Sequence, residues 1–252
     1  MNLTTQTFLQ HPPSGRCVFN DVLEPLIALQ DEVRYAFGYS VESDVESAQR
    51  MESLFSMPQP FGRNEWNSEQ RLRDVLKLRE RLLAANQLYV VGAGSQPILT
   101  AEYDSDARFI AADGAVGAVD DLSKVLCVVS DGDGGKHLQR AIESSVHIVL
   151  HAHGDNLETW NNLCTKWSKM KSVSSLTLTH QTRSIFSGMH NPGGFTDGDR
   201  ALCFLHSMGI DLGQIQCIGF STQKVGMWSG VTNPVAKLDK LQWMNEAMIR
   251  LG

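Results

Sequence analysis

The chain has 252 residues and a formal net charge of −6, and 42% of its residues are hydrophobic. That is enough apolar material for one large α/β core with a helical extension. No run of Lys or Arg forms the basic stripe of a nucleic-acid-binding protein, so we expect no nucleic-acid partner. No stretch approaches the roughly 18 apolar residues that span a bilayer, so we expect no membrane partner.

The five cysteines indicate a reducing compartment. Their number is odd, none forms a C-x-x-C pair, and Cys127 and Cys217 lie within apolar runs that resemble strands. Buried, reduced thiols are typical of proteins from such a compartment. The N-terminus also lacks a charged segment followed by an apolar one. We therefore expect a cytoplasmic protein with buried thiols.

The first 85 residues have the periodicity of helices and no strand pattern. Apolar residues recur at helical spacing from Asp21, and a second helix is predicted over 41–54. A third helix follows Asn67, which forms a typical capping pair with Gln70. We predict an N-terminal helical region over 1–85, and nothing in it indicates chemistry.

From Leu88 onward, short apolar runs alternate with stretches of helical length. The runs cover residues 88–91, 108–112, 125–130, 146–152, 175–179 and 215–219. Strands that are apolar throughout are covered on both faces, which is typical of parallel sheets. We predict an α/β domain over 86–252, with a doubly wound, mostly parallel sheet of about six strands and helices on both faces.

Ligands of a doubly wound sheet bind outside the carboxyl ends of its strands. In this sequence, the segments that follow five of the runs are rich in Asp, Gly, His or Gln. These segments cover residues 92–97, 112–115, 130–135, 151–156 and 179–183, and a further polar segment covers 191–200. Loops alone do not require this pattern, so it predicts one polar site at that edge of the sheet.

Two of these segments have two interpretations each. Glycines at Gly92-Ala93-Gly94 let backbone N–H groups approach a phosphate, but a tight turn explains them equally well. Asp113 is placed to accept hydrogen bonds from ribose hydroxyls or to cap a helix. The sequence leaves these alternatives open.

The pair Asp131-x-Asp133 is a stronger signal. Two carboxylates at a strand end can bracket a hard cation, and Mg²⁺ binds one or two carboxylates together with water and phosphate oxygens. Asp155 is a candidate third ligand, and a glycine-rich acidic turn is the alternative interpretation. His151 and His153 lack a further zinc-type ligand, so zinc is not favoured. We expect His153 to orient Asp155 or to be a satisfied strand-end histidine.

Four cationic residues are candidate phosphate ligands. Arg183 and Arg200 are the first choices, followed by Lys224 and Lys136. The segment 196–200 lies at the start of a predicted helix. One of its two aspartates can therefore be the N-cap of that helix and not a site residue.

Taken together, the motifs resemble those of archaeal 6-hydroxymethyl-7,8-dihydropterin pyrophosphokinases. The resemblance covers about residues 88–245, and its two specific motifs are HAHGDN at 151–156 and GGFTDGDR at 193–200. The family is more distantly similar to thiamine pyrophosphokinase. Three departures from the family's usual pattern are present: Gly132 stands in place of a bulky apolar residue, Ser95-Gln96 in place of Pro-Ser, and Ser221 in place of an Asp.

This resemblance implies Mg²⁺-dependent transfer of a diphosphate from ATP to the hydroxymethyl group of the dihydropterin, with release of AMP, in methanopterin or folate-type cofactor synthesis. It implies a homodimer and a metal site at Asp131, Asp133 and Asp155, which are catalytic together with Arg200. The implied nucleotide-binding residues are Gly92, Gly94, Ser95, Asp113, Gly114, Gln181 and Arg183. The implied acceptor-binding residues are Asn156, Thr196, Asp197 and Asp199. Asp155 or Asp199 is the expected general base, if one is needed.

Two other functions fit part of the pattern. A metal-dependent glycosyltransferase also uses a D-x-D motif to hold a nucleotide sugar. A non-catalytic nucleotide-binding module is the second alternative, but it has no need for three carboxylates.

Overall fold

Every strand that the sequence predicts is present in the computed structural model, which describes residues 18–230 and 233–252. The strands are β1 (Gln87–Val91), β2 (Ala107–Ala112), β3 (Val125–Ser130), β4 (His147–Ala152), β5 (Leu176–His180), β6 (Met189–His190) and β7 (Ile215–Ile218). They form one parallel sheet in the order β6-β5-β4-β3-β2-β1-β7. The α/β fold class is confirmed.

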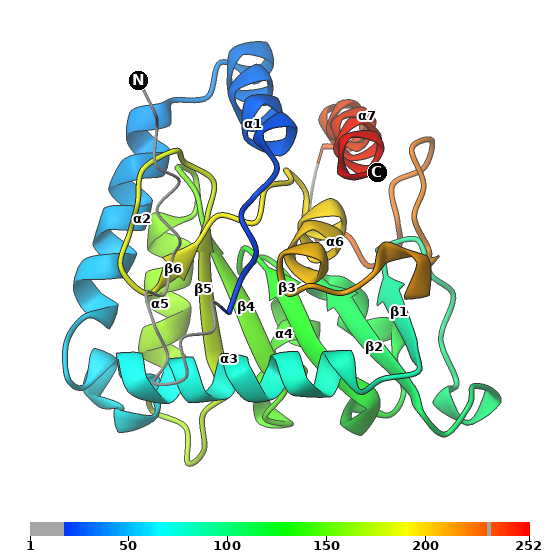
Figure 1. Cartoon of the computed structure of the whole chain (residues 1–252), viewed down its shortest axis with the longest axis horizontal. Coiled ribbons are helices and arrows are strands. Elements are labelled where there is room, and N and C mark those ends of the chain that lie inside the picture. Colours follow the sequence, from blue (N-terminus) through cyan, green and yellow to red (C-terminus); the bar gives the residue numbers. More distant parts are fainter. Residues whose placement is uncertain (1–17, 231–232) are drawn as a thin grey trace.

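Helices surround this sheet. They are α1 (Glu24–Phe37), α2 (Val41–Phe55), α3 (Ser68–Leu83), α4 (Gly135–Glu143), α5 (Leu157–Trp167), α6 (Asp197–Ser207) and α7 (Pro234–Leu251). Short 3₁₀ helices cover Pro60–Gly62, Asn64–Trp66, Thr100–Glu102, Asp113–Ala118, Leu122–Lys124 and Leu212–Gln214. Figure 1 places α1 and α7 side by side at one end of the sheet, and the two helices are in contact. No helix in the described ranges is long and apolar enough to cross a bilayer.

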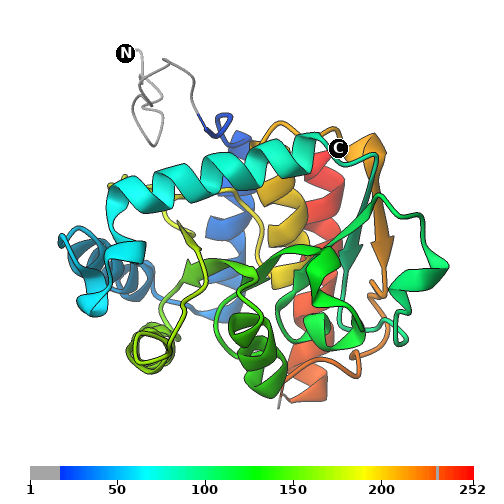
Figure 2. The same cartoon turned by 90° about the horizontal axis from the view of Figure 1, so that it is seen from below.

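Strand β1 shows why the strands are apolar throughout. Leu88 and Val90 pack into the core that contains α3 and α6, whereas Tyr89 and Val91 pack into the core that contains α2, α4 and α5. Successive side chains of a strand point to opposite faces, so a sheet covered on both faces needs apolar residues at every position. Figure 2 shows α3 and α6 on one side of the sheet and α4 and α5 on the other.

The N-terminal helices share these two cores. Met51 of α2 is buried with one face of the sheet, and Leu78 of α3 is buried with the other. The Asn67 side chain caps α3 by accepting the Gln70 N–H at 2.8 Å, as the capping pair predicts. The boundary at residue 85 stays a prediction, but the helices before it pack directly on the sheet.

Two details of the sheet differ from expectation. Strand β6 has two residues, too few to appear as an apolar run. The prediction of buried thiols is wrong for Cys217, because β7 lies at the edge of the sheet and pairs with β1 alone. Cys127, Cys164 and Cys203 are free and buried, and Cys17 lies outside the described residues.

Buried histidines in the strands make the fold sensitive to acid. Burial lowers the pKa of His147, His180 and His190 to about 3 each. In the unfolded chain a histidine titrates near pH 6.5, so between about pH 3 and 6.5 the unfolded state binds more protons. The stabilising contribution is therefore complete above about pH 6.5 and is lost as the pH falls below it.

We predict that the free energy of unfolding drops on acidification by up to about 1.4 kcal/mol per pH unit for each buried histidine. Urea unfolding at about pH 7.5, 6.5 and 5.5 measures this slope. His190→Phe should reduce the slope, because that ring packs flat on Phe19 and phenylalanine does not titrate. His206→Gln at a half-buried position is the control and should leave it unchanged. Equal slopes for His190→Phe and the wild type would contradict this account.

Candidate active site

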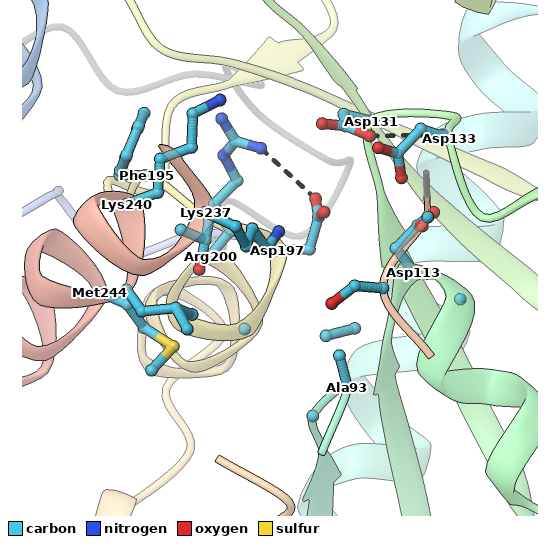
Figure 3. Close-up of a pocket in the computed structure, with 18 of the residues that line it drawn as sticks. Ala93, Asp113, Asp131, Asp133, Phe195, Asp197, Arg200, Lys237, Lys240 and Met244 are labelled. Carbon is cyan, nitrogen blue, oxygen red and sulfur yellow. Dashed lines mark hydrogen bonds and ion pairs between the residues drawn. The ribbon is translucent and has the colours of Figure 1, made fainter. Parts of the chain in front are cut away.

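A cavity of about 350 Å³ lies at the carboxyl ends of the central strands (Figure 3). Several segments that are distant in the sequence line it: those that follow β1 to β5, the start of α6, the residues between 219 and 230, the first half of α7 and the residues between 38 and 44. This is the edge at which a parallel sheet binds ligands, as the sequence predicts.

Three carboxylates meet on one wall of the cavity. Asp113 follows β2, Asp131 and Asp133 follow β3, and one oxygen of each lies within 4.8 Å of the others. Asp113 has a positive φ of 47°, which is strained for a residue with a side chain. Ser130 Oγ donates to Asp113 Oδ1 at 2.5 Å, and a Cβ at Gly134 would lie 2.7 Å from the same oxygen. The hydrogen bond from Ser130 and the space left by Gly134 keep the Asp113 carboxylate beside the other two, at the cost of a strained backbone.

The crowding changes the acidity of these groups. Burial raises the pKa of Asp113 well above its ordinary value, and the neighbouring carboxyls of Asp197, Asp133 and Asp131 raise it further. Burial also raises the pKa of Asp197, as does the charge of Asp131. Burial acts in the same direction on Asp131, but the contact with His153 and the charge of Arg200 outweigh it, so that the pKa of Asp131 lies below its usual range. The wall formed by these carboxylates therefore carries uncompensated negative charge, and its carboxylate oxygens are the ligands that hard divalent cations prefer.

His153 joins Asp131 to the loop after β4. Its Nε2 lies 3.4 Å from Asp131 Oδ2, and its Nδ1 accepts the backbone N–H of Asp155 at 3.3 Å. An accepting Nδ1 assigns the ring proton to Nε2, which then donates to the carboxylate. His153 thus orients the backbone of Asp155. The Asp155 side chain is exposed and lines the cavity, but it lies outside the cluster of three carboxylates.

Cationic groups form the opposite wall. Figure 3 shows Arg200 from α6 and Lys237 from α7 across the cavity from the carboxylates. Lys240 of α7 also lines the cavity, with its Nζ over the rings of Tyr39 and Phe195, and Lys224 lines it as well. Arg200 is 4% exposed; its Nη2 donates to Gln181 Oε1 at 2.9 Å and its Nη1 lies 3.4 Å from Asp197 Oδ1. Its Nε has no hydrogen-bond partner within the described part of the chain. A guanidinium that lines a cavity and is fixed by its neighbours fits a site for anionic oxygens.

Helix α6 begins with a capping box. The Asp199 carboxylate accepts the N–H groups of Phe195 at 2.5 Å and Thr196 at 2.8 Å, and Thr196 in turn caps the helix. Asp199 is buried and lies outside the cavity lining, because its oxygens are used within the cap. Thr196 and Asp197 do line the cavity. Of the two aspartates, Asp199 therefore takes the capping alternative and Asp197 faces the site.

Four further predicted residues also lie away from the cavity lining. Asn156 is buried, and its amide donates to the carbonyls of Asp131 at 2.8 Å and His151 at 2.7 Å, which ties the ends of β3 and β4 together. Arg183 pairs on the surface with acidic residues of α1. Ser95 is buried, with its Oγ donating to the carbonyl of Gly92. Gly92, Gly94, Gly114 and Gln181 do line the cavity, whereas the candidate phosphate ligand Lys136 does not.

The glycine turn after β1 packs against the segment after β7. The N–H groups of Gly92 and Gly94 donate to the carbonyls of Ile218 and Gly219, and the N–H of Ser95 donates to Gly92. A Cβ at Gly94 would lie 2.8 Å from the Gly219 carbonyl oxygen. These donors face the chain, so the geometry favours the tight-turn interpretation over a phosphate cradle.

The contributions of α2 and α7 to the site are not apparent from the sequence pattern. Asp44 of α2 lines the cavity and is 2% exposed, and Lys237 and Lys240 of α7 lie on the cationic wall. A signal for Asp44 does exist, because it continues the buried stripe of Ala48 and Met51 at helical spacing. A carboxylate on an apolar stripe needs a buried partner.

The fold and this cavity define a parallel α/β enzyme whose acidic wall faces a cationic one. Comparison with known proteins gives the family. The 6-hydroxymethyl-7,8-dihydropterin pyrophosphokinase of Pyrococcus furiosus is 30% identical over 200 residues, which cover 76% of this chain and 75% of that protein. The protein of the same name from Methanocaldococcus jannaschii is 30% identical over 178 residues, which cover 67% of this chain and 67% of that protein. The one from Methanothermobacter thermautotrophicus is 27% identical over 226 residues, which cover 82% of this chain and 85% of that protein. The chain belongs to the 6-hydroxymethyl-7,8-dihydropterin pyrophosphokinase family. No protein-family model matches it.

We predict that divalent cations stabilise the protein through the three clustered carboxylates. At a hundredfold excess over Kd, Mg²⁺ or Mn²⁺ should add about 2.7 kcal/mol of stability, or several degrees in Tm. Asp133→Asn should abolish this rise and should itself raise the Tm of the metal-free protein, because it removes repulsion from Asp113. Asp104→Asn, an exposed aspartate remote from the cavity, is the matched control. The prediction fails if the metal-dependent rise survives Asp133→Asn.

Proposed function

We propose that the chain transfers the diphosphate of ATP to the hydroxymethyl oxygen of 6-hydroxymethyl-7,8-dihydropterin, with Mg²⁺ as cofactor. The observation that carries the proposal is the pair of opposed walls: clustered carboxylates on one side of the cavity and a buried arginine with lysines on the other. A polyphosphate held between a cation and basic side chains needs such a site. The names of the relatives support the pterin acceptor and the reaction class.

The residues of the acidic wall fit a magnesium ion. Asp113, Asp131 and Asp133 bring three oxygens within 4.8 Å of one another. A cation bound between them would offset the repulsion among these carboxylates. We assign the metal to these three residues, with Asp155 close by in the same cavity as a ligand through water. When bound, Mg²⁺ would offset charge on the phosphate oxygens.

Arg200 is the residue that we assign to the diphosphate itself. Its guanidinium is held by Gln181 and Asp197, and the residue lines the cavity. Preorganised donors of this kind stabilise charge that develops during transfer. Lys237 and Lys240 extend the same positive surface along α7.

The two ends of the cavity suit the two substrates. Backbone surface at Gly92 and Gly94, with Phe220 and Trp228, lies toward the β1 end and would hold the nucleoside. Tyr39 and Phe195 lie at the end formed by α1 and α2, where a flat pterin ring would meet aromatic side chains. The metal ligands that follow β2 and β3 lie between these ends, where the transferred group must be.

In the proposed reaction the hydroxymethyl oxygen attacks the β-phosphorus of ATP. The bond from that phosphorus to the oxygen bridging the α-phosphate breaks, and AMP leaves. Asp197 projects between the carboxylate cluster and Arg200, and we assign to it the proton of the hydroxymethyl group. Asp199 is unsuited to this role because its oxygens are used in the helix cap. The product is an activated diphosphate ester for methanopterin or folate-type cofactor synthesis.

A product assay tests this proposal. The protein, ATP, Mg²⁺ and 6-hydroxymethyl-7,8-dihydropterin are incubated, and AMP and the pterin diphosphate are separated by chromatography. We expect equal amounts of the two products, and a rate loss on the order of 10³-fold in Asp131→Asn/Asp133→Asn. Asp104→Asn should retain full activity, since it lies outside the cavity lining.

Each other outcome has a defined meaning. Binding of ATP without formation of AMP would reject the diphosphate transfer and favour a nucleotide-binding module. Release of a nucleoside diphosphate from a sugar nucleotide, but no reaction with the pterin, would identify a glycosyltransferase instead.

A further inference from the structure

Asp44 of α2 is buried beneath the cavity and contacts two separate parts of the site. Its Oδ1 accepts the backbone N–H of Gly154 at 2.7 Å, and both of its oxygens lie 3.0 Å from Gln181 Nε2. Arg34 of α1 compensates its charge, with Nε donating to Oδ2 at 2.7 Å. Arg34 also donates through Nη2 to the backbone carbonyl of Gln181. One carboxylate thus joins α1, the loop after β4 and the residue that follows β5.

The chemistry of these groups determines which way the Gln181 amide faces. An ionised carboxylate only accepts hydrogen bonds, so Asp44 must face the NH₂ group of Gln181. The amide oxygen is then directed to Arg200, whose guanidinium only donates, and Gln181 Oε1 accepts Arg200 Nη2 at 2.9 Å. Gln181 is 8% exposed, so water cannot readily replace either partner. Asp44 thus fixes the donor end of the amide whose oxygen accepts from Arg200 and also lies 3.4 Å from His151 Nε2.

The contact with Gly154 positions a second part of the site. Gly154 lies between His153 and Asp155, which reach Asp131 and the cavity respectively. A Cβ at Gly154 would lie 2.8 Å from the Cβ of Ser43, so the loop packs closely on the start of α2. Asp44 closes this contact by accepting the Gly154 N–H.

We propose that Asp44 is a positioning residue of the active site, which orients Arg200 through Gln181 and fixes the loop that carries His153 and Asp155. The inference rests on the proposed function, because the phosphate contact of Arg200 is part of it. The N-terminal helix pair is, on this account, a component of the catalytic apparatus and more than a cover for the sheet.

The substitution Asp44→Asn tests the relay. Both Asp44 oxygens reach the Gln181 NH₂ group, so asparagine keeps one acceptor there, but its own NH₂ group must then face Arg34 Nε or the Gly154 N–H, which are also donors. The amide cannot keep all of these contacts, so its hold on Gln181 and on the loop after β4 weakens. We expect kcat to fall on the order of 10²-fold, with a smaller change in KM for the pterin, because Gln181 and the loop after β4 no longer hold Arg200 and Asp155 firmly at the transferred group. Binding of Mn²⁺ to the metal-free variant should persist, because the carboxylate cluster is intact.

The exchange variant Asp44→Asn/Gln181→Glu is the discriminating measurement. It keeps the net charge and swaps the carboxylate and the amide: the carboxylate at position 181 would accept from the amide at position 44 with one oxygen and from Arg200 with the other. We expect its kcat to be at least tenfold higher than that of Asp44→Asn, although one of the contacts to Arg34 or Gly154 stays weakened. Asp31→Asn is the matched control, because Asp31 also pairs with Arg34 but touches neither Gln181 nor Gly154. It should keep wild-type kcat.

The outcomes separate this inference from the proposed function. A wild-type protein that forms no AMP overturns the proposed function and with it the inference. An active wild type with unchanged kcat in Asp44→Asn, or with no recovery in the exchange variant, overturns the relay alone. If Asp44→Asn does not fold, Gln181→Met removes the link without leaving Arg34 unpaired, and it should show the same loss of kcat. Wild-type kcat in that variant also overturns the relay.

Discussion

The crowding of three carboxylates at neighbouring strand ends is the constraint on which the rest of the site depends. Parallel pairing of β2 with β3, in which Ala112 lies beside Val129, brings the residues after both strands to one edge of the sheet. Like charges within 4.8 Å are unfavourable, and the fold supports them with a strained backbone at Asp113 and a buried hydroxyl at Ser130. A bound cation would relieve this repulsion, which is the role that we propose for the cluster.

Helices α6 and α7 supply the cationic wall that lies across the cavity from these carboxylates. Helix α6 begins at a capping box that keeps Asp199 out of the cavity and turns Arg200 into it. Helix α7 comes from the end of the chain and adds lysines, whereas α1 and α2 come from its beginning and hold Gln181 through Asp44. The acidic wall is thus local to the sheet, but the cationic wall requires the whole chain to fold.

The fold could be predicted from the sequence because its signal is local: apolar runs separated by stretches of helical length. The same is true of Asp131 and Asp133, which are close in sequence. Asp113 is recognisable as a polar strand end, but the sequence does not show that the positive φ of its backbone turns it toward β3. The side-chain direction of Asp155 depends on a loop that Asp44 holds across 110 residues, and no local pattern reports such a contact.

The measurement that tests this account most directly is an anomalous-scattering experiment. Crystals would be grown with Mn²⁺ and α,β-methylene-ATP, whose carbon bridge prevents cleavage of the bond that the reaction breaks. We predict one anomalous peak between Asp113, Asp131 and Asp133, with the β-phosphate between that peak and Arg200 and the nucleoside toward the glycine turn after β1. A metal held elsewhere, or a nucleotide bound outside this cavity, would contradict the account.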